Sequence, residues 1–311
     1  MRITRQMEDL RPEAKPVVLA IGSFDGVHRG HQLILRTAAE KALLRHGDAW
    51  VLTFDPHPAK VLKPDRAPPL ITSTEHKLVL MEPFGLAGCI VMPFTRELAS
   101  EPPEKFLDRL QQNIPTLAEV VVGANWTFGQ GAKGNAKLLA AQAPKRGFEA
   151  TVVEPVTLDG EPISSTRLRR AISFGAFDEA EEMLDRPFSI LGTVVHGKQI
   201  GTRMGFPTAN LDPHNEVRPP SGVYAVRARI YSRLYDGAAF ISEMSSAKEG
   251  PSGFIVEVHL LDFEDDVYGQ DLEVIFVKRL RDVRHFDSRL QLKQQIALDV
   301  EEARTVLESV D

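Results

Sequence analysis

Short apolar runs alternate with longer amphipathic stretches between residues 17 and 185. The runs are compact and rich in β-branched residues, which is typical of strands buried on both faces of a sheet. Between them, apolar residues recur at helical spacing, as at Leu35, Ala38 and Ala42, and Gly47 is a natural end for that helix. Strands that alternate with helices predict a parallel sheet with covered faces. The expected strands are "VVLAIG" (17–22), "AWVLTFD" (49–55), "GCIVMPF" (88–94), "EVVVGA" (119–124) and "EATVVEPV" (149–156), and the other expected helices cover 103–110, 133–145 and 164–184.

The pattern changes after Arg186 and Pro187, where strand-like runs follow one another without a helix long enough for a crossover. Such a series predicts an antiparallel barrel or sandwich. The last residues, 287–310, return to helical spacing, with Asp287 or Ser288 as the expected N-cap and an apolar stripe that we expect to pack on the core. Because the two halves differ in class and share no repeat, we predict two domains, residues 1–186 and 187–311. The strand-like runs lie at 188–197, 222–231, 237–242, 253–263 and 272–280, and the stripe consists of Leu290, Leu292, Ile296, Val300, Ala303 and Leu307.

Composition agrees with an ordinary two-domain globular protein. The chain has 311 residues, of which 43% are hydrophobic and 26% charged, so both domains can bury a core. Its formal net charge of -6 argues against a general nucleic-acid surface, which usually shows a basic balance. We therefore expect small-molecule partners, with no nucleic acid, and any bound polyanion should be small and locally held.

The cysteine content and the N-terminal residues indicate the cellular compartment in which the protein is expected. A single cysteine, Cys89, excludes an internal disulfide, fits a reducing compartment and is expected to be a buried strand residue. The first residues lack the apolar segment of a signal peptide, and no apolar run approaches the roughly 20 residues that span a bilayer. We expect a cytoplasmic protein that binds no membrane and is a monomer or weak homo-oligomer.

The stretch "GSFDGVHRGHQL" (22–33) is the first candidate site, because it joins a predicted strand to a predicted helix. Gly22, Gly26 and Gly30 let backbone N–H groups approach a ligand, and the free N–H groups of a helix start favour anions. His28 and His31 are three residues apart, so on a helix they share a face. That arrangement suits hydrogen bonds to phosphoryl oxygens as charge builds on them.

Two other interpretations of these histidines stay open on the residues alone. A histidine at a helix start is often only a cap or a surface residue. A histidine pair three apart could also be half of a metal site, with His57 in "TFDPHP" as a further ligand, although no cysteine is near.

The stretch also resembles a known signature. Gly22-x-Phe24-Asp25-Gly26-Val27-His28-x-Gly30-His31 is similar to the HxGH motif of the nucleotidyltransferase superfamily, in the form found in bacterial flavin adenylyltransferases. The resemblance implies a Rossmann-like parallel-sheet domain that transfers the adenylyl group of ATP to FMN. It further implies catalytic roles for His28 and His31 and ligand contacts at Gly22, Phe24, Asp25, Gly30 and His57.

Later motifs extend this resemblance. "ISSTRLRRAI" (163–172) is similar to the segment whose serine, threonine and arginine hold ATP phosphates, which implies that role for Ser165, Thr166 and Arg169. Taken alone, the serine pair would suit a helix N-cap equally well. "VVGANWTFGQGAKGN" (121–135) implies nucleotide or flavin contacts at Asn125 and Phe128, although many relatives have Asp-Phe-Arg-Phe-Gly where this chain has Asn-Trp-Thr-Phe-Gly.

The C-terminal half carries a second candidate site. "GTVVHGKQIGTRMGFPTANL" (192–211) resembles the flavokinase domain fused to the adenylyltransferase in bacterial bifunctional FAD synthetases, and it implies a cofactor contact at Gly205. Thr208 and Asn210 lie two apart after a proline, so on an extended segment both project to one side, where their oxygens suit Mg²⁺ bridging ATP phosphates. Phosphorylation of riboflavin needs a base for the hydroxyl, and the resemblance implies Glu257 in "FIVEVHLLDF".

Two departures from the family pattern concern the kinase half. The arginine of the usual Gly-Arg-x-x-Gly-Phe segment is shifted by one residue, and "FISEMSSAKEGPSG" (240–253) replaces the usual Asn-x-Gly-x-x-Pro-Thr-Phe segment. The leading hypothesis is a bifunctional enzyme that uses riboflavin, FMN and ATP with Mg²⁺. The alternatives are an adenylyltransferase whose C-terminal barrel only binds flavin, and a flavin-binding or sensing protein with two silent sites.

Overall fold

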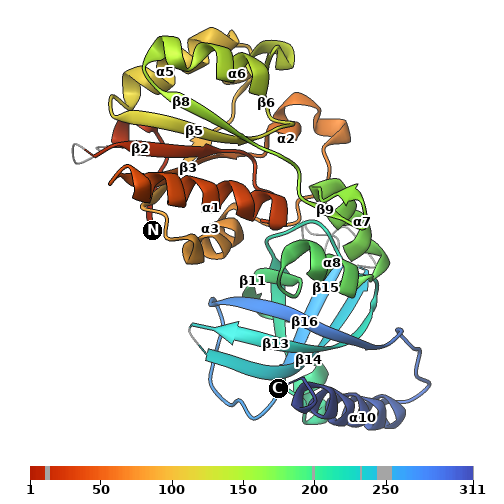
Figure 1. Cartoon of the computed structure of the whole chain (residues 1–311). Coiled ribbons are helices and arrows are strands. Elements are labelled where there is room, and N and C mark those ends of the chain that lie inside the picture. Colours follow the sequence, from red (N-terminus) through yellow and green to blue (C-terminus); the bar gives the residue numbers. More distant parts are fainter. Residues whose placement is uncertain (11–14, 198–199, 232, 244–253, 311) are drawn as a thin grey trace. The chain divides into compact units, whose positions relative to one another are not determined.

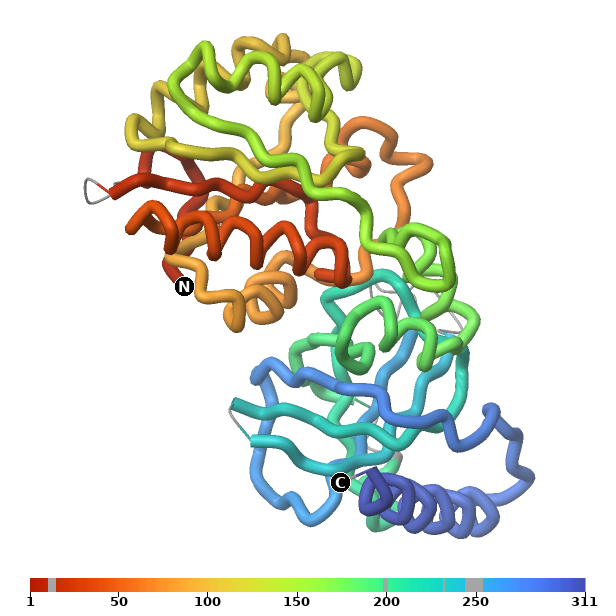
Figure 2. The backbone as a smooth tube through the Cα atoms, viewed as in Figure 1, coloured from red at the N-terminus to blue at the C-terminus, as the bar shows by residue number. Residues whose placement is uncertain are grey.

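The computed structural model describes residues 1–10, 15–197, 200–231, 233–243 and 254–310. The chain forms two compact units, whose backbone can be followed by its colours in Figure 2. Unit 1 comprises Met1–Pro68 and Thr74–Ser165, and unit 2 comprises Pro69–Ser73 and Thr166–Asp311. The short segment Pro69–Ser73 thus belongs with the C-terminal unit, as do the two helices just before residue 186. The domain boundary at residue 186 remains a prediction from the change in the sequence pattern.

Unit 1 is built on a six-stranded sheet in the order β1-β4-β3-β2-β5-β8, and all its neighbouring strands are parallel (Figure 1). This confirms the predicted parallel sheet. The sequence pattern did not indicate the short first strand at the edge, which pairs with β4. The strands are β1 (Arg2–Thr4), β2 (Val17–Ile21), β3 (Asp48–Asp55), β4 (Gly88–Pro93), β5 (Leu117–Gly123) and β8 (Glu149–Val153).

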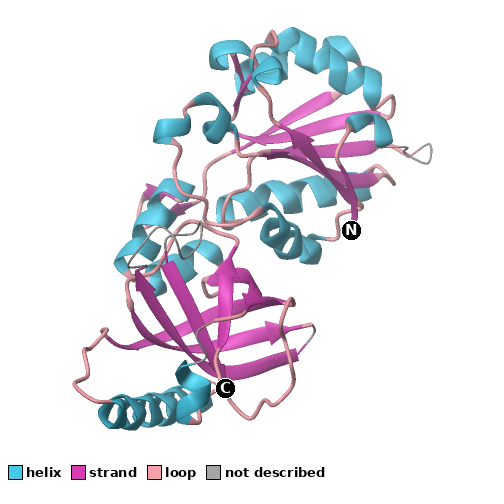
Figure 3. Ribbon diagram, turned by 180° about the vertical axis from the view of Figure 1, so that it is seen from behind, coloured by secondary structure: helices cyan, strands magenta, loops and turns pink. Residues whose placement is uncertain are grey.

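Helices cover both faces of this sheet, as Figure 3 shows from behind. Successive residues of β2 point to opposite faces: Val18 and Ala20 join the core under α1, whereas Leu19 and Ile21 join the core under α5 and α6. Cys89 is fully buried in β4, as expected, and burial raises the pKa of its thiol to about 12. The helices are α1 (Arg29–Leu44), α2 (Pro58–Leu62), α3 (Thr74–Met81), α4 (Arg96–Ala99), α5 (Pro103–Asn113) and α6 (Ala136–Gln142).

Two expected helices differ from their predicted extent. The stretch predicted at 133–145 forms the shorter α6, capped by the side chain of Asn135, followed by a 3-10 turn. The stretch predicted at 164–184 is two helices, α7 (Ser165–Phe174) and α8 (Phe177–Leu184), because Gly175 adopts φ +74° between them. Two small hairpins pair β6 (Thr127–Phe128) with β7 (Gly134–Asn135) and β9 (Thr157–Leu158) with β10 (Glu161–Pro162). In the described part of unit 1, 3-10 turns lie at Met7–Asp9, Pro64–Arg66, Glu82–Phe84, Gln130–Ala132 and Pro144–Arg146.

Unit 2 is a closed barrel in the order β11-β12-β15-β14-β13-β16, with every pairing antiparallel. Of the two folds that the strand pattern allowed, the barrel is therefore the one formed. The short α9 (Ile200–Met204) precedes the second strand, and α10 (Arg289–Glu308) follows the last. The strands are β11 (Ser189–Val195), β12 (Ala209–Pro213), β13 (Gly222–Ile230), β14 (Arg233–Glu243), β15 (Phe254–Leu260) and β16 (Asp271–Arg281).

The apolar stripe of α10 serves two purposes along its length. The hydroxyl of Ser288 accepts a hydrogen bond from the backbone N–H of Gln291 at 3.2 Å, which makes Ser288 the N-cap. Ala303 and Leu307 are fully buried against the barrel, whereas Leu290 is 66% exposed. The prediction that the whole stripe packs on the core is thus wrong at its N-terminal end. Leu292 and Ile296 line a cavity, and Val300 lines it while also packing against the buried cluster of Ala303 and Leu307.

A buried carboxylate ties α1 to the sheet of unit 1. Glu119 of β5 is fully buried and forms ion pairs with Lys41 (2.7 Å) and Arg45 (2.8 Å) of α1. The hydroxyl of Thr151 in β8 also donates a hydrogen bond to it. The carboxylate therefore joins two strands and the helix that begins at the histidine motif.

We expect Glu119→Gln to lower the free energy of unfolding of unit 1 by about 2–3 kcal/mol, since the cations lose a buried partner but, being partly exposed, regain water. Urea unfolding followed by tryptophan fluorescence measures this, because both tryptophans, Trp50 and Trp126, lie in unit 1. The matched control is Glu149→Gln, since Glu149 also pairs with Arg45 but is 70% exposed, and its loss should cost less than about 1 kcal/mol. Equal losses in the two variants would contradict the assigned role of Glu119.

Candidate active sites

The turn between β2 and α1 brings the two histidines of the first candidate site together. His28 is the N-cap of α1, and its Nδ1 accepts a hydrogen bond from the backbone N–H of His31 at 3.4 Å. The two imidazole rings stack with centroids 3.6 Å apart and an angle of 17° between their planes. A Cβ at Gly30 would lie 3.2 Å from Cε1 of His28, so glycine leaves the room that this ring occupies. The shared face predicted from the spacing is therefore present.

Phe24 and Asp25, which precede the histidine pair, are buried, so their side chains are not open to a ligand. Phe24 is fully buried with φ 49°, and its ring meets His31 edge-on at 5.4 Å, so its side chain supports the histidine from the core. The ring of Phe24 also lies against Gly22, whose added Cβ would be 3.1 Å from it. A contact of Phe24 with a nucleotide would have to come from its backbone. Asp25 is buried as well, with its carbonyl accepting a hydrogen bond from the Ser165 hydroxyl at 3.0 Å.

His31 is held in its neutral form. Burial, followed by the positive charges of His28 and Lys77, lowers the pKa of His31 well below its ordinary value. Its Nδ1 is buried and has no hydrogen-bond partner among the residues that the structure describes. A neutral imidazole can still donate one hydrogen bond, so the ring retains the ability to contact a phosphoryl oxygen.

The other predicted phosphate-binding residues lie on α7. Ser165 at the start of this helix belongs to unit 1 and is bonded to the histidine turn, as given above. Thr166 and Arg169 belong to unit 2, and Nε of Arg169 donates a hydrogen bond to the carbonyl of Pro69 at 2.7 Å. The structure thus connects Ser165 with the histidine turn, and roles for Thr166 and Arg169 stay predictions.

His57 occupies a capping position. It precedes α2, and its Nδ1 accepts a hydrogen bond from the backbone N–H of Ala59 at 3.2 Å. No group of three or more histidine, cysteine, aspartate or glutamate side chains suited to a metal ion occurs in the described ranges.

Unit 1 contains a cavity of about 670 Å³, called the aromatic cavity because five of the side chains that line it are aromatic. Asn125 and Phe128, both predicted from the resemblance, line it, and Ser23 extends it to the histidine turn. Trp126 stacks on Phe128 with ring centroids 4.4 Å apart, so tryptophan in place of the usual phenylalanine keeps an aromatic surface at this position. The cavity has the size and lining expected for a flat organic ligand. Its other aromatic residues do not stand out in the sequence, since Phe54 and Phe94 belong to ordinary apolar runs and Phe106 lies in a predicted helix.

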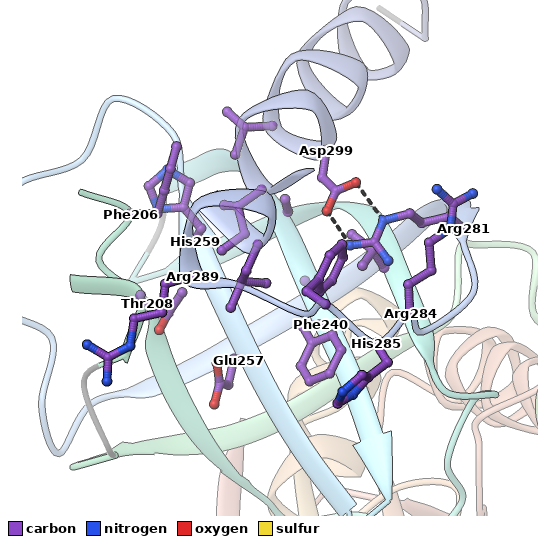
Figure 4. A pocket seen from close by; sticks show the side chains of 18 of the residues that line it. Phe206, Thr208, Phe240, Glu257, His259, Arg281, Arg284, His285, Arg289 and Asp299 are labelled. Atoms are coloured by element: carbon purple, nitrogen blue, oxygen red, sulfur yellow. Dashed lines mark hydrogen bonds and ion pairs between the residues drawn. The ribbon is translucent and has the colours of Figure 1, made fainter. Parts of the chain in front are cut away.

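Unit 2 contains a second cavity, of about 610 Å³, between the barrel and the start of α10. Thr208, Glu257 and His259 line it, and Figure 4 shows Thr208 and Glu257 in the same part of it. Asn210 lies directly opposite Glu257 in the pairing of β12 with β15, which places both side chains on one face of the sheet. The three predicted kinase residues Thr208, Asn210 and Glu257 are therefore neighbours.

These residues fit a magnesium ion. Their hydroxyl, amide and carboxylate oxygens are the hard ligands that Mg²⁺ prefers. A Cβ at Gly197 would lie 2.2–2.3 Å from the amide group of Asn210, so this amide fills the space that a glycine leaves open. Replacing Gly197 would consequently displace Asn210.

Gly205 shapes the approach to this site. It adopts φ +91° after α9, where its N–H donates to the Thr202 carbonyl at 3.1 Å and the Phe206 N–H to the Gly201 carbonyl at 2.9 Å. This pair of bonds is the Schellman arrangement that ends a helix and turns the chain. Gly205 thereby directs the chain toward Thr208, while Gly201 and Phe206 line the cavity.

The far wall of the second cavity was not predicted. Arg281 and Asp299 form a two-bond ion pair, with Nε–Oδ1 at 2.7 Å and Nη2–Oδ2 at 2.6 Å, which joins β16 to α10 (Figure 4). Both side chains are nearly buried. The only available signal was the basic and aromatic cluster "RDVRHF" before the last helix. Phe240 also lines the cavity, and residues 244–253 of the departing segment lie outside the described residues.

Comparisons with known proteins match both halves of the chain. A family model described as FAD synthetase matches residues 10–167, and one described as riboflavin kinase matches residues 184–307. The bifunctional riboflavin kinase/FMN adenylyltransferase of Bacillus subtilis is 35% identical over 306 residues, covering 97% of this chain and 96% of its own. That of Pseudomonas fluorescens is 34% identical and covers 98% of each.

A solved structure is similar over nearly the whole chain. It is described as a macrolide-efflux protein from Streptococcus pneumoniae, and it has 30% sequence identity and a TM-score of 0.81, covering 97% of this chain and 98% of its own. In the described part of this chain, no helix is long and apolar enough to cross a membrane. On the two domain matches and the full-length relatives, this chain belongs to the bifunctional riboflavin kinase/FMN adenylyltransferase family.

Proposed function

We propose that this chain carries out two successive reactions on one flavin. In unit 2, riboflavin and ATP give FMN and ADP. In unit 1, FMN and a second ATP give FAD and pyrophosphate. The observation that carries the proposal is that each unit has a ligand-sized cavity beside its own predicted set of reactive residues.

The kinase reaction needs a base because the attacking group is a neutral hydroxyl. Glu257 accepts the proton of the riboflavin hydroxyl while the hydroxyl oxygen bonds to the γ-phosphorus of ATP, and ADP leaves. Thr208 and Asn210 would hold Mg²⁺ with ATP, and the ion would supply neutralising charge to the phosphates. The position of Glu257 on the cavity wall, opposite Asn210, supports these roles.

The adenylyltransferase reaction needs no base for its nucleophile. The phosphate of FMN is already anionic near neutral pH, with a second pKa of about 6. One of its oxygens bonds to the α-phosphorus of ATP as the bond to pyrophosphate breaks. His28 and His31 donate hydrogen bonds to the phosphoryl oxygens while charge builds there, and Ser165, Thr166 and Arg169 hold the triphosphate. Asn125 and Phe128 bind nucleotide or flavin in the aromatic cavity.

The alternative in which the barrel only binds flavin is not favoured. It was motivated by the departing segment 240–253, but the riboflavin kinase model matches residues 184–307 and the full-length relatives are named for both activities. We expect the two sites to use only small-molecule partners. Placement in the cytoplasm and a monomeric or weakly oligomeric state remain predictions.

One assay tests both activities. Purified full-length protein with riboflavin, ATP and Mg²⁺ should form FMN and then FAD, which are separated by chromatography. Formation of FAD only from supplied FMN would remove the kinase proposal, and the absence of both products would remove the enzyme proposal. Chelation of Mg²⁺ should stop FMN formation.

A further inference from the structure

Lys77 of α3 is a buried cation that the proposed mechanism does not use. Lys77 is only 4% exposed. The ammonium donates hydrogen bonds to the carbonyl of Ser23 at 3.1 Å and to Oγ1 of Thr53 at 3.4 Å. The Thr53 hydroxyl in turn donates to the same Ser23 carbonyl at 3.3 Å. Two elements, α3 and β3, therefore converge on one carbonyl oxygen.

Burying a lysine costs free energy, because its ammonium group loses water, so a buried lysine suggests that its charge has a function. Lysine is almost never fully buried without a partner of opposite charge, and no ion pair of Lys77 occurs within the described ranges. Burial lowers the pKa of the ammonium, although nearby carboxylates act in the opposite direction. An apolar side chain of similar length would fill the same space without this desolvation cost. Packing alone thus gives no reason for a lysine here.

The carbonyl that Lys77 holds lies in the histidine turn. Ser23 follows Gly22, precedes the buried Asp25, and lines the aromatic cavity of unit 1. The Lys77 charge also acts on His31, since it contributes to the lowered pKa of that ring after burial and His28. Lys77 is consequently linked both to the backbone of the turn and to one of its two histidines.

We propose that Lys77 is a positioning residue for adenylyl transfer, which fixes the histidine turn through the Ser23 carbonyl and places a buried ammonium group near His31. The inference rests on the proposed function of unit 1. Lys77 acts on the backbone and on His31, and it needs no contact with either substrate. The ionisable groups that act on it are Asp25 in the turn, the Cys89 thiol on β4, Asp55 on β3 and Glu75 on α3, and Lys77 in turn acts on His31 of α1.

Lys77→Met tests this with the full-length protein. We expect kcat for FAD formation from FMN to fall about 30–100-fold, with a smaller change in KM for ATP, because the loss is one of preorganisation at the reacting groups. Riboflavin phosphorylation by the same preparation should be unchanged, since unit 2 does not contain Lys77. Lys137→Met is the matched control, because Lys137 is an exposed lysine on α6 of the same unit.

The titration of His31 separates positioning from a loss of folding. NMR of selectively labelled histidine should show the pKa of His31 rising in Lys77→Met toward its ordinary value, because one positive neighbour is gone while burial and His28 remain. Tryptophan fluorescence checks that unit 1 stays folded. A wild-type kcat together with an unchanged His31 titration would overturn the inference, whereas wild-type protein that makes no FAD would instead overturn the proposed function.

Thr53→Val keeps the proposal testable if the lysine variant does not fold. Valine matches the shape of the fully buried Thr53 but removes the hydroxyl that shares the Ser23 carbonyl with Lys77. We expect kcat for FAD formation to fall several-fold, and less than additively when Lys77→Met is combined with it. An unchanged kcat in Thr53→Val, or full additivity in the double variant, would contradict the shared role.

Discussion

His28→Ala is expected to slow FAD formation from FMN by about 10²–10³-fold, the loss typical of removing one hydrogen-bond donor aimed at a developing charge. FMN formation from riboflavin should keep its wild-type rate, because the kinase residues lie in unit 2. Chromatography of the flavins in one reaction measures both steps. The expected pattern is accumulation of FMN in a mixture that would otherwise proceed to FAD.

The structure also shows how to separate chemistry from folding at this position. His28 caps α1, so its removal by alanine costs about 1 kcal/mol of helix stability as well as the imidazole. His28→Asn restores a capping side chain without restoring the ring. We expect the asparagine variant to regain stability but not FAD formation. Recovery of activity in His28→Asn would show that the cap, and not the imidazole, limits the reaction.

The sequence predicted the local framework of the first site well, because its signals are local. A buried strand, glycines and a helix start suffice to place His28 and His31 on one face, and the structure stacks them. Lys77 could not be found in this way. In "TEHKLVLM" the sequence predicts a lysine on the solvent-exposed side of a short helix. Only the tertiary structure, in which Lys77 of α3 contacts Thr53 of β3, shows that it points inward.

The walls of the two cavities show the same limit. An apolar residue that lines a ligand site has the same periodicity as one in the core, so Ile296 and Ala303 look alike in the stripe of α10. Only the tertiary packing of the helix on the barrel decides which of its apolar residues are buried and which line the cavity. The break at Gly175 was similarly hidden, because one glycine inside an amphipathic stretch is compatible with a continuous helix.

Glu257→Gln is expected to produce the reverse defect. The amide preserves the size and much of the hydrogen bonding of the carboxylate but cannot accept the hydroxyl proton, so FMN formation should fall by about 10²–10⁴-fold. FAD formation from supplied FMN should continue at the wild-type rate, since its nucleophile is already ionised. Added riboflavin should then remain unconverted, with neither FMN nor FAD formed from it.

A control on the same strand tests whether Glu257 acts as a base or only supports the cavity. His259 also lines the cavity, and its Nδ1 lies 2.7 Å from the Pro207 carbonyl, so His259→Gln disturbs the wall without removing the carboxylate. We expect that variant to raise KM for riboflavin more than it lowers kcat, whereas Glu257→Gln lowers kcat with little change in KM. If Glu257→Gln instead changed KM alone, the carboxylate would be a binding group, and the base of the kinase reaction would have to be sought elsewhere. Because His28 and Glu257 stand in different units, loss of one activity in each variant is the result that two independent sites require.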